Sequence, residues 1–241
     1  NMKDTELMTA LWILSSILKE YYGKKVIILI DEYDVPLDKA FENNYYNEMI
    51  ILLRNMLKQS LKTNDNLYMA VLTGCLRIAR ESIFTRLNNF NIFSITDQYF
   101  DEYFGFTDKE VKEILQYYKV PEAFEQTKKW YDGYRFGNTD IYCPWDVINH
   151  CRALKVEPDA TPQPYWINTS GNYIVKRFIE KANQQTRREI EQLIEGKAIQ
   201  KEIRLELTYN ELDSTNLWSV LFATGYLTQQ GKPLKRFLQS I

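Results

Sequence analysis

Two acidic residues directly follow a short, wholly apolar stretch of the chain. Asp31 and Glu32 come after Val26–Ile30, in which four of the five residues are β-branched, and Lys24 and Lys25 precede this run. Such a run is typical of a strand that is buried on both faces of a parallel sheet. Because ligands bind at the carboxyl ends of the strands in open α/β sheets, the sequence predicts a functional site at Asp31 and Glu32.

An apolar strand followed by Asp-Glu has the pattern of a Walker B motif in P-loop NTPases. In that motif the Asp, here Asp31, holds Mg²⁺, and the Glu, here Glu32, polarises the attacking water. Carboxylate oxygens suit Mg²⁺, which is a hard cation that keeps most of its waters. A buried strand can equally end in acidic residues that cap the next helix or lie in solvent. Asp34 could then cap a helix over 37–41, with Pro36 in its first turn.

Helices and a second strand are expected around these carboxylates. Apolar residues three and four positions apart predict amphipathic helices over 4–22 and 45–62. A second apolar run, Leu67–Leu72, follows the second helix and ends at Thr73. The order helix, strand, helix, strand favours a right-handed crossover and a parallel pair. We therefore expect Asp31 and Thr73 to lie at the same edge of one sheet.

Three further polar residues follow the second apolar run. Thr73 occupies the position at which NTPases of this type place the polar residue called sensor 1, and a turn-forming Thr-Gly is the alternative interpretation. Arg77 and Arg80 are three residues apart and would share one face of a helix. Two guanidinium groups near a strand end could bind a phosphate. Exposed, solvated surface is the alternative for both arginines.

The rest of the chain contains more helices than strands. Asn91–Ile95 has the pattern of a third short strand, and Thr107 with Glu110 forms a capping box at the start of a helix. Two apolar runs around Gly137-Asn138 predict a hairpin. The segment 157–164 contains three prolines and is the best candidate for a linker.

The composition limits the classes of protein that the chain can belong to. A net charge of −2 over 241 residues predicts no general attraction to nucleic acid or to a membrane surface. The 17 Tyr, 12 Phe and 5 Trp indicate a packed globule. Three cysteines without a CxxC spacing fit a reducing compartment, and no apolar run approaches the ~20 residues of a membrane span. We therefore expect a cytoplasmic protein without a membrane segment.

Seven longer strings succeed one another along the chain. They read IILIDEYDVPL, LTGCLRIARESIF, FGFTDKEV, KWYDGYRFG, PWDVIN, YWINTSGN and LWSVLFATGYLT. In these strings and their order the chain resembles the bacterial AAA-ATPase-like family of predicted P-loop ATPases. The resemblance implies ATP and Mg²⁺ as cofactors, Asp31 as the metal ligand, and Glu32 and Thr73 as catalytic residues. Arg77 and Arg80 are the candidates for binding the nucleotide.

One motif of this family is not found in the sequence. A phosphate-binding loop has the pattern GxxxxGK[ST], whereas none of the three Gly-Lys pairs in the chain is followed by Ser or Thr. Members of the family usually carry a PD-(D/E)XK nuclease-like domain after the ATPase part. We therefore expect this chain to be part of a longer protein, and to lack both the Walker A loop and the nuclease-like domain. We also expect the longer protein to hydrolyse ATP and the chain by itself not to do so.

The expected fold is α/β and consists of three parts. The first, over 1–105, is a partial P-loop NTPase parallel sheet with helices, and the second, over 106–156, is a helical extension with a hairpin. The third, over 165–241, is mostly helical, with a winged-helix arrangement as one alternative.

The expected function is ATP binding and hydrolysis by the longer protein, coupled to a partner or to the nuclease-like domain. A non-catalytic protein-interaction module derived from an ATPase fold is the alternative. A nuclease that uses Asp31, Glu32 and Asp34 as metal ligands would need a Lys on the neighbouring strand, and 67–72 has none. The expected partner is a second copy or another protein, and nucleic acid would bind only through a nuclease-like domain outside this chain.

Overall fold

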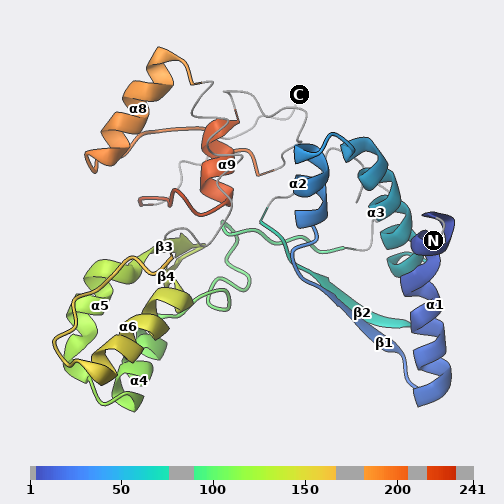
Figure 1. Ribbon diagram of the computed structural model, residues 1–241, viewed down its shortest axis with the longest axis horizontal. Coiled ribbons are helices and arrows are strands. Elements are labelled where there is room, and N and C mark those ends of the chain that lie inside the picture. Colours follow the sequence, from blue (N-terminus) through green and yellow to red (C-terminus); the bar gives the residue numbers. More distant parts are fainter. Residues whose placement is uncertain (1–3, 76–89, 167–181, 206–215, 232–241) are drawn as a thin grey trace. The chain divides into compact units, whose positions relative to one another are not determined.

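The computed structural model describes residues 4–75, 90–166, 182–205 and 216–231 (Figure 1). The chain divides into two compact units. The first unit comprises Asn1–Asn91 and Lys201–Thr224, and the second comprises Ile92–Gln200 and Gly225–Ile241. Both helices and strands are present, so the predicted α/β class is confirmed. The three-part division at 105, 156 and 165 stays a prediction.

The first unit contains helices and one parallel pair of strands. The helix predicted over 4–22 and the one predicted over 45–62 are both present, and each precedes its strand as expected. In chain order the elements are α1 (Asp4–Tyr22), β1 (Val26–Ile30), α2 (Val35–Glu42), α3 (Tyr46–Leu61), β2 (Leu67–Leu72) and α9 (Leu217–Ala223).

The strands β1 and β2 pair in parallel, as predicted from the helix between them. Ile27 pairs with Met69 and Ile30 pairs with Leu72, after a shift of register at Val26. The carboxyl ends of the two strands therefore lie at the same edge of the sheet. The prediction that Asp31 and Thr73 share this edge is confirmed, because each directly follows the last paired residue of its strand.

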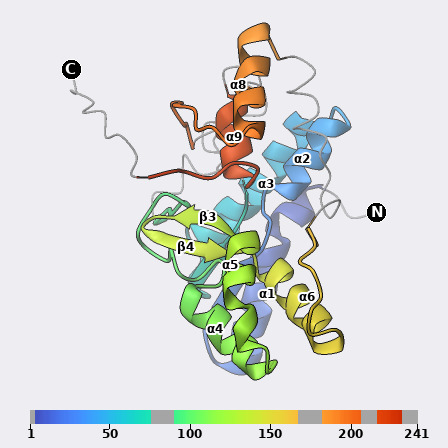
Figure 2. The same ribbon diagram turned by 90° about the vertical axis from the view of Figure 1, so that its left-hand side faces the viewer.

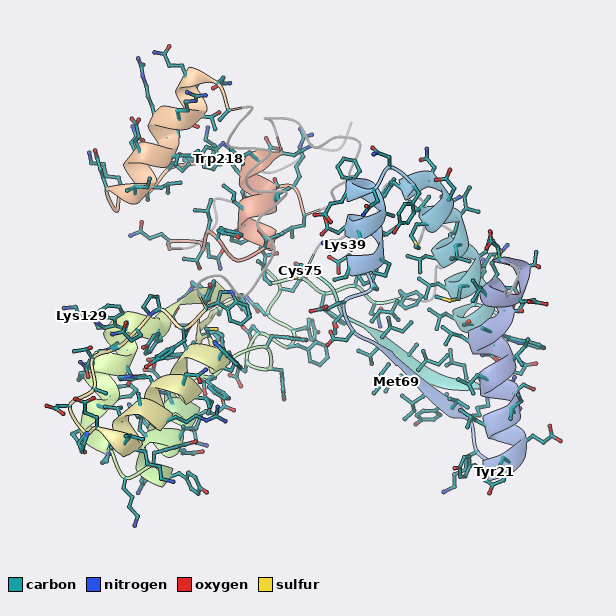
Figure 3. All side chains as sticks on the ribbon, in the orientation of Figure 1. Tyr21, Lys39, Met69, Cys75, Lys129 and Trp218 are labelled. Atoms are coloured by element: carbon teal, nitrogen blue, oxygen red, sulfur yellow. The ribbon has the colours of Figure 1, made fainter. Side chains whose placement is uncertain are left out.

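The prediction that β1 is buried on both faces is wrong for the part of the chain that the structure describes. Ile28 is buried, whereas Ile27 is 51% exposed and Leu29 is 73% exposed. Successive side chains of a strand point to opposite faces, and α1 and α3, which pack on each other, contact the pair. Met69, the partner of Ile27, is also exposed (Figure 3). A run of five apolar residues thus does not tell whether one face or two are covered.

A buried polar contact joins α1 to the turn before β2. The Asn64 side-chain amide donates to Ser15 Oγ at 2.9 Å and to the Ser60 carbonyl at 3.0 Å. All three residues are buried, and buried amide and hydroxyl groups cost free energy unless they are hydrogen-bonded. This contact therefore fixes where the chain enters β2 relative to α1 and α3.

The second unit is built from helices around a small apolar core and one hairpin. Its core includes Val111 and Leu115 of the first helix and Val147 and Leu154 of a later one. In chain order the elements are α4 (Asp108–Tyr117), the 3₁₀ turn η1 (Pro121–Ala123), α5 (Phe124–Tyr131), β3 (Asp132–Phe136), β4 (Thr139–Tyr142), α6 (Pro144–Val156) and α8 (Gln184–Ile194).

The predicted capping box at the start of α4 is confirmed and belongs to a larger polar contact. The Thr107 hydroxyl accepts from the Glu110 backbone N–H, and the Glu110 carboxylate accepts from the Thr107 N–H. Asp108 accepts hydrogen bonds from the Tyr142 hydroxyl at 2.5 Å and from Lys128 Nζ at 2.7 Å. Burial opposes ionisation of Asp108, but these two donors outweigh it and lower its pKa. The contact ties α4 to α5 and β4.

The hairpin is confirmed, whereas the predicted strand over Asn91–Ile95 is wrong. β3 and β4 pair antiparallel around Gly137-Asn138. Residues 91–95 form no strand because the Asp97 carboxylate accepts from the Ser94 N–H at 2.7 Å, and the Asp97 N–H donates to the Ser94 carbonyl at 3.0 Å. Local side-chain bonds of this kind compete with strand pairing.

In the described ranges, every helix is too short or too polar to cross a membrane.

His150, on α6, is buried in the second unit without a hydrogen-bonding partner for either ring nitrogen among the described residues. Its ring lies 5.4 Å from the ring of Tyr131. Burial lowers the pKa of His150 below its ordinary value of 6.5. The imidazole is therefore neutral in the folded protein at neutral pH.

We predict that the second unit loses stability below pH 6.5 because of His150. The unfolded chain binds a proton at this histidine more readily than the folded chain, so the free energy of unfolding falls as the pH falls. The loss attributable to one group is at most about 1.4 kcal/mol per pH unit. Urea unfolding at pH 7.5 and pH 5.5 should show a smaller pH dependence in His150→Leu than in the wild type.

Glu157→Gln, which changes an exposed residue just after α6, is the matched control and should retain the wild-type pH dependence. Parallel stability curves for the wild type and His150→Leu between these two pH values would contradict the prediction.

Candidate functional site

The candidate site lies at the carboxyl ends of β1 and β2, where backbone hydrogen bonds continue past the paired residues. The Thr73 N–H donates to the Ile30 carbonyl at 2.9 Å, and the Tyr33 N–H donates to the Thr73 carbonyl at 3.0 Å. Between these bonds, Glu32 adopts a left-handed backbone conformation with φ of 53°. This conformation is uncommon for a residue with a side chain, and here it turns the chain from β1 into α2.

The side chains of Asp31 and Thr73 meet at this edge. The Thr73 hydroxyl donates a hydrogen bond to Asp31 Oδ1. The bond joins residues 42 positions apart in the sequence and orients the carboxylate relative to the strand ends. Asp31 and Glu32 are both exposed, so a ligand can reach their oxygens.

Gly74 allows the turn after β1 to approach β2 closely. A Cβ atom at this position would lie 2.6 Å from Asp34 Oδ1 and 2.7 Å from Cε1 of Tyr33. Distances under 3.0 Å are not seen for real Cβ atoms. A side chain at position 74 would therefore displace the turn that carries Asp31 and Glu32.

Asp34 is the N-cap residue of α2, as one interpretation of the sequence predicted, but its side chain does not cap the helix. It is the residue before α2, and Pro36 lies in the first turn as expected. The Asp34 backbone is helical, and its side chain makes no capping hydrogen bond to α2. Asp34 is buried, and its carboxylate lies against Gly74.

Cys75 (Figure 3) directly follows Gly74 at this edge of the sheet. Burial of its sulfur atom raises the pKa of the Cys75 thiol, and the charges of Asp34, Glu32 and Asp31 raise it further. The thiol therefore stays protonated at neutral pH. Because the thiolate is the nucleophilic and metal-binding form of cysteine, Cys75 does not suit either role here.

The donors at this edge suit a hard cation that arrives with other ligands. Mg²⁺ is bound in proteins through one or two carboxylates, substrate phosphates and waters, and Asp31 is an exposed carboxylate held in place by Thr73. No group of three His, Cys, Asp or Glu side chains that could hold a metal occurs among the described residues.

The structure brings together three of the five predicted site residues. Asp31 and Thr73 are hydrogen-bonded at the strand ends and Glu32 directly follows Asp31, whereas Arg77 and Arg80 lie outside the described residues. The sequence alone does not predict the close approach of Gly74 to Tyr33 and Asp34. The glycine directly after Thr73 is the sequence feature that points to this close approach. A Thr-Gly pair also occurs in many ordinary turns.

Comparison with known proteins shows similarity to a protein family and to a longer bacterial protein. Residues 1–84 match a family model described as "Predicted AAA-ATPase". An uncharacterized protein in the vnfD 5' region of Azotobacter chroococcum mcd 1 is 24% identical over 212 residues. The aligned part is 86% of this chain and 37% of the relative, so the chain spans little more than a third of the relative's length. No solved structure matches the chain.

The matched residues contain β1, β2 and the three side chains at their ends. The resemblance that the sequence motifs indicated is confirmed over this part. Through residues 1–84, the chain matches the AAA-ATPase-like family.

Proposed function

We propose that the ends of β1 and β2 form the Walker B part of an ATP site. The observation that carries this proposal is the hydrogen bond between Thr73 and Asp31 at the shared edge of a parallel pair. Both residues lie within the part that matches a family of predicted ATPases. Two side chains from separate strands thus converge at the edge of the sheet where α/β proteins bind ligands.

Each side chain has a distinct role in this proposal. Asp31 would hold the Mg²⁺ of the nucleotide, and Thr73 would keep the Asp31 carboxylate oriented. Glu32 would orient and polarise the water that attacks the terminal phosphate. The bound Mg²⁺ would neutralise charge on the phosphates during transfer. Arg77 and Arg80 come five and eight residues after the end of β2 and remain candidates for binding the phosphates.

Hydrolysis is proposed for the longer protein to which this chain would belong. The GxxxxGK[ST] loop, whose backbone N–H groups and Lys hold the phosphates, is not found in the sequence. The proposed protein is cytoplasmic and couples its nucleotide state to a second copy, to another protein or to a nuclease-like domain. A non-catalytic interaction module is the second candidate, because an α/β fold can persist after its site has lost the activity.

We predict that Glu32→Gln abolishes ATP hydrolysis but not ATP binding in the longest gene product that contains this chain. A general base contributes about 10²–10⁴-fold to a rate, so kcat should fall at least about 100-fold. Asp31→Asn should instead weaken Mg²⁺-dependent nucleotide binding. Phosphate release measures the first effect, and titration with a fluorescent ATP analogue, with and without Mg²⁺, measures the second.

Asp65→Asn is the matched control, because Asp65 lies in the turn before β2, at the opposite end of the strand from Thr73, and should leave both measurements unchanged. A long gene product whose activity does not respond to Glu32→Gln would favour the interaction module. Turnover by the 241-residue chain itself would show that the chain contains a phosphate-binding loop of another pattern.

We predict that Gly74→Ala damages the site, although position 74 carries no functional group. The new methyl group would collide with Asp34 and Tyr33, and overpacking of this kind typically costs about 1–3 kcal/mol. The displaced turn should also weaken Mg²⁺-dependent nucleotide binding. Urea unfolding and the nucleotide titration measure the two effects.

Gly133→Ala is the control, because a Cβ at Gly133 has no atom within 4 Å. Equal stability and equal nucleotide binding in the two alanine variants would show that the turn tolerates a side chain at position 74.

A further inference from the structure

The second unit exposes an unusual number of aromatic side chains in one segment, Ile92–Phe104, which we call the aromatic loop. Tyr99 is 72% exposed and Tyr103 is 77% exposed. Surfaces of soluble proteins rarely gather large apolar side chains in this way unless they bind a partner. The exposed large side chains of the loop are Ile92, Phe93, Tyr99, Phe100, Tyr103 and Phe104.

Hydrogen bonds hold the aromatic loop against the β3–β4 hairpin (Figure 2). The Gly137 N–H donates to the Ile95 carbonyl at 2.9 Å, and the Asn138 N–H donates to Asp101 Oδ2 at 3.1 Å. A Cβ at Gly137 would lie 2.5 Å from the Asp97 carbonyl oxygen, so the close approach requires glycine. A surface held in place in this way loses less conformational freedom when a partner binds.

The rings of the loop form a cluster although they are exposed. The Phe93 ring centroid lies 5.1 Å from that of Phe100 and 5.6 Å from that of Tyr99, and Phe100 lies 6.0 Å from Tyr103. Phe100 has a left-handed backbone with φ of 67°, which is uncommon for a residue with a side chain. Strained residues of this kind concentrate at binding sites.

The charge of the loop limits what can bind to it. Between residues 90 and 105 there are three acidic residues, Asp97, Asp101 and Glu102, and no Lys or Arg. Asp97 and Asp101 accept hydrogen bonds within the unit, and Glu102 is exposed. Nucleic acids and anionic membranes bind through clustered basic residues, so the loop suits neither of them.

Exposed aromatic rings beside carboxylates are complementary to cations. Arg and Lys side chains are attracted to the faces of aromatic rings, and carboxylates add charge-assisted hydrogen bonds. The aliphatic parts of a partner would contact Ile92 and Phe104 at the two ends of the loop. Tyrosine is also among the residues that contribute most to binding at protein interfaces.

We propose that the aromatic loop is a docking surface for a basic, amphipathic segment of another protein, whose Arg or Lys side chains stack on Tyr99 and Tyr103 and pair with Glu102. This proposal does not depend on the ATP site. The hairpin positions the loop, the rings supply the contact area, and the excess of acidic residues selects a cationic partner.

The test uses the 241-residue chain and a fluorescein-labelled peptide of Arg and Leu at helical spacing, followed by fluorescence anisotropy. The double variant Tyr99→Ser/Tyr103→Ser should weaken binding about tenfold or more. Glu102→Lys should also weaken it, and this loss should shrink at high salt because exposed charges are screened. A peptide with Glu in place of every Arg should bind at least about tenfold more weakly than the basic peptide.

Two matched variants test whether the effect is local. Tyr117→Ser changes a tyrosine that is 83% exposed on α4, and Glu122→Lys changes an exposed carboxylate of the same unit; both should bind the basic peptide as the wild type does. Circular dichroism melting of each variant checks that it is folded. The comparison of the basic and acidic peptides uses only the wild type, so it does not depend on the folding of any variant.

Several results would overturn the proposal. The proposal fails if the wild type does not bind the basic peptide, if the acidic peptide binds equally well, or if the double tyrosine variant binds as tightly as the wild type. Sedimentation velocity provides a further test. A wild-type dimer that dissociates in the double tyrosine variant would assign the loop to a second copy of this chain. Protection of Tyr99 and Tyr103 from chemical modification in the free monomer would assign it to a contact within the chain.

Discussion

Backbone hydrogen bonds that continue beyond the ends of β1 and β2 are the constraint on which the candidate site depends. They join Thr73 to both Ile30 and Tyr33, so the turn after β1 cannot move without the end of β2. The hydroxyl of Thr73 then reaches Asp31, and the missing side chain of Gly74 leaves room for Tyr33 and Asp34. The orientation of one carboxylate thus follows from the register of a parallel pair.

The same pair of strands has a second consequence for the first unit. With α1 and α3 in contact with the two strands, alternate side chains of β1 point away from them, and Leu29 is largely exposed. A parallel sheet is normally covered on both faces. The end of β1 therefore carries hydrogen-bonded polar side chains, whereas the exposed face of β1 carries the apolar side chains Ile27 and Leu29.

The second unit buries polar side chains and exposes large aromatic ones. Tyr142 is fully buried but satisfied by Asp108, whereas His150 is fully buried without a hydrogen bond in the described ranges. The rings of the aromatic loop lie at the surface, although equally large side chains form the core. Folding alone would favour burial of these rings, whereas the proposed docking of a partner would account for their exposure.

The sequence by itself determined the helices over 4–22 and 45–62, the two strands, the capping box and the hairpin, because local periodicity and turn residues control these elements. It also placed Asp31 and Thr73 at a common edge, since a helical crossover between two strands leaves few arrangements of the pair. Tertiary structure decided that one face of β1 is exposed and that Asn91–Ile95 is no strand, because burial and local competition depend on which groups are nearby. It also decided that Gly74 is required at the site, since its contacts come from the turn after β1, about 40 residues earlier in the chain.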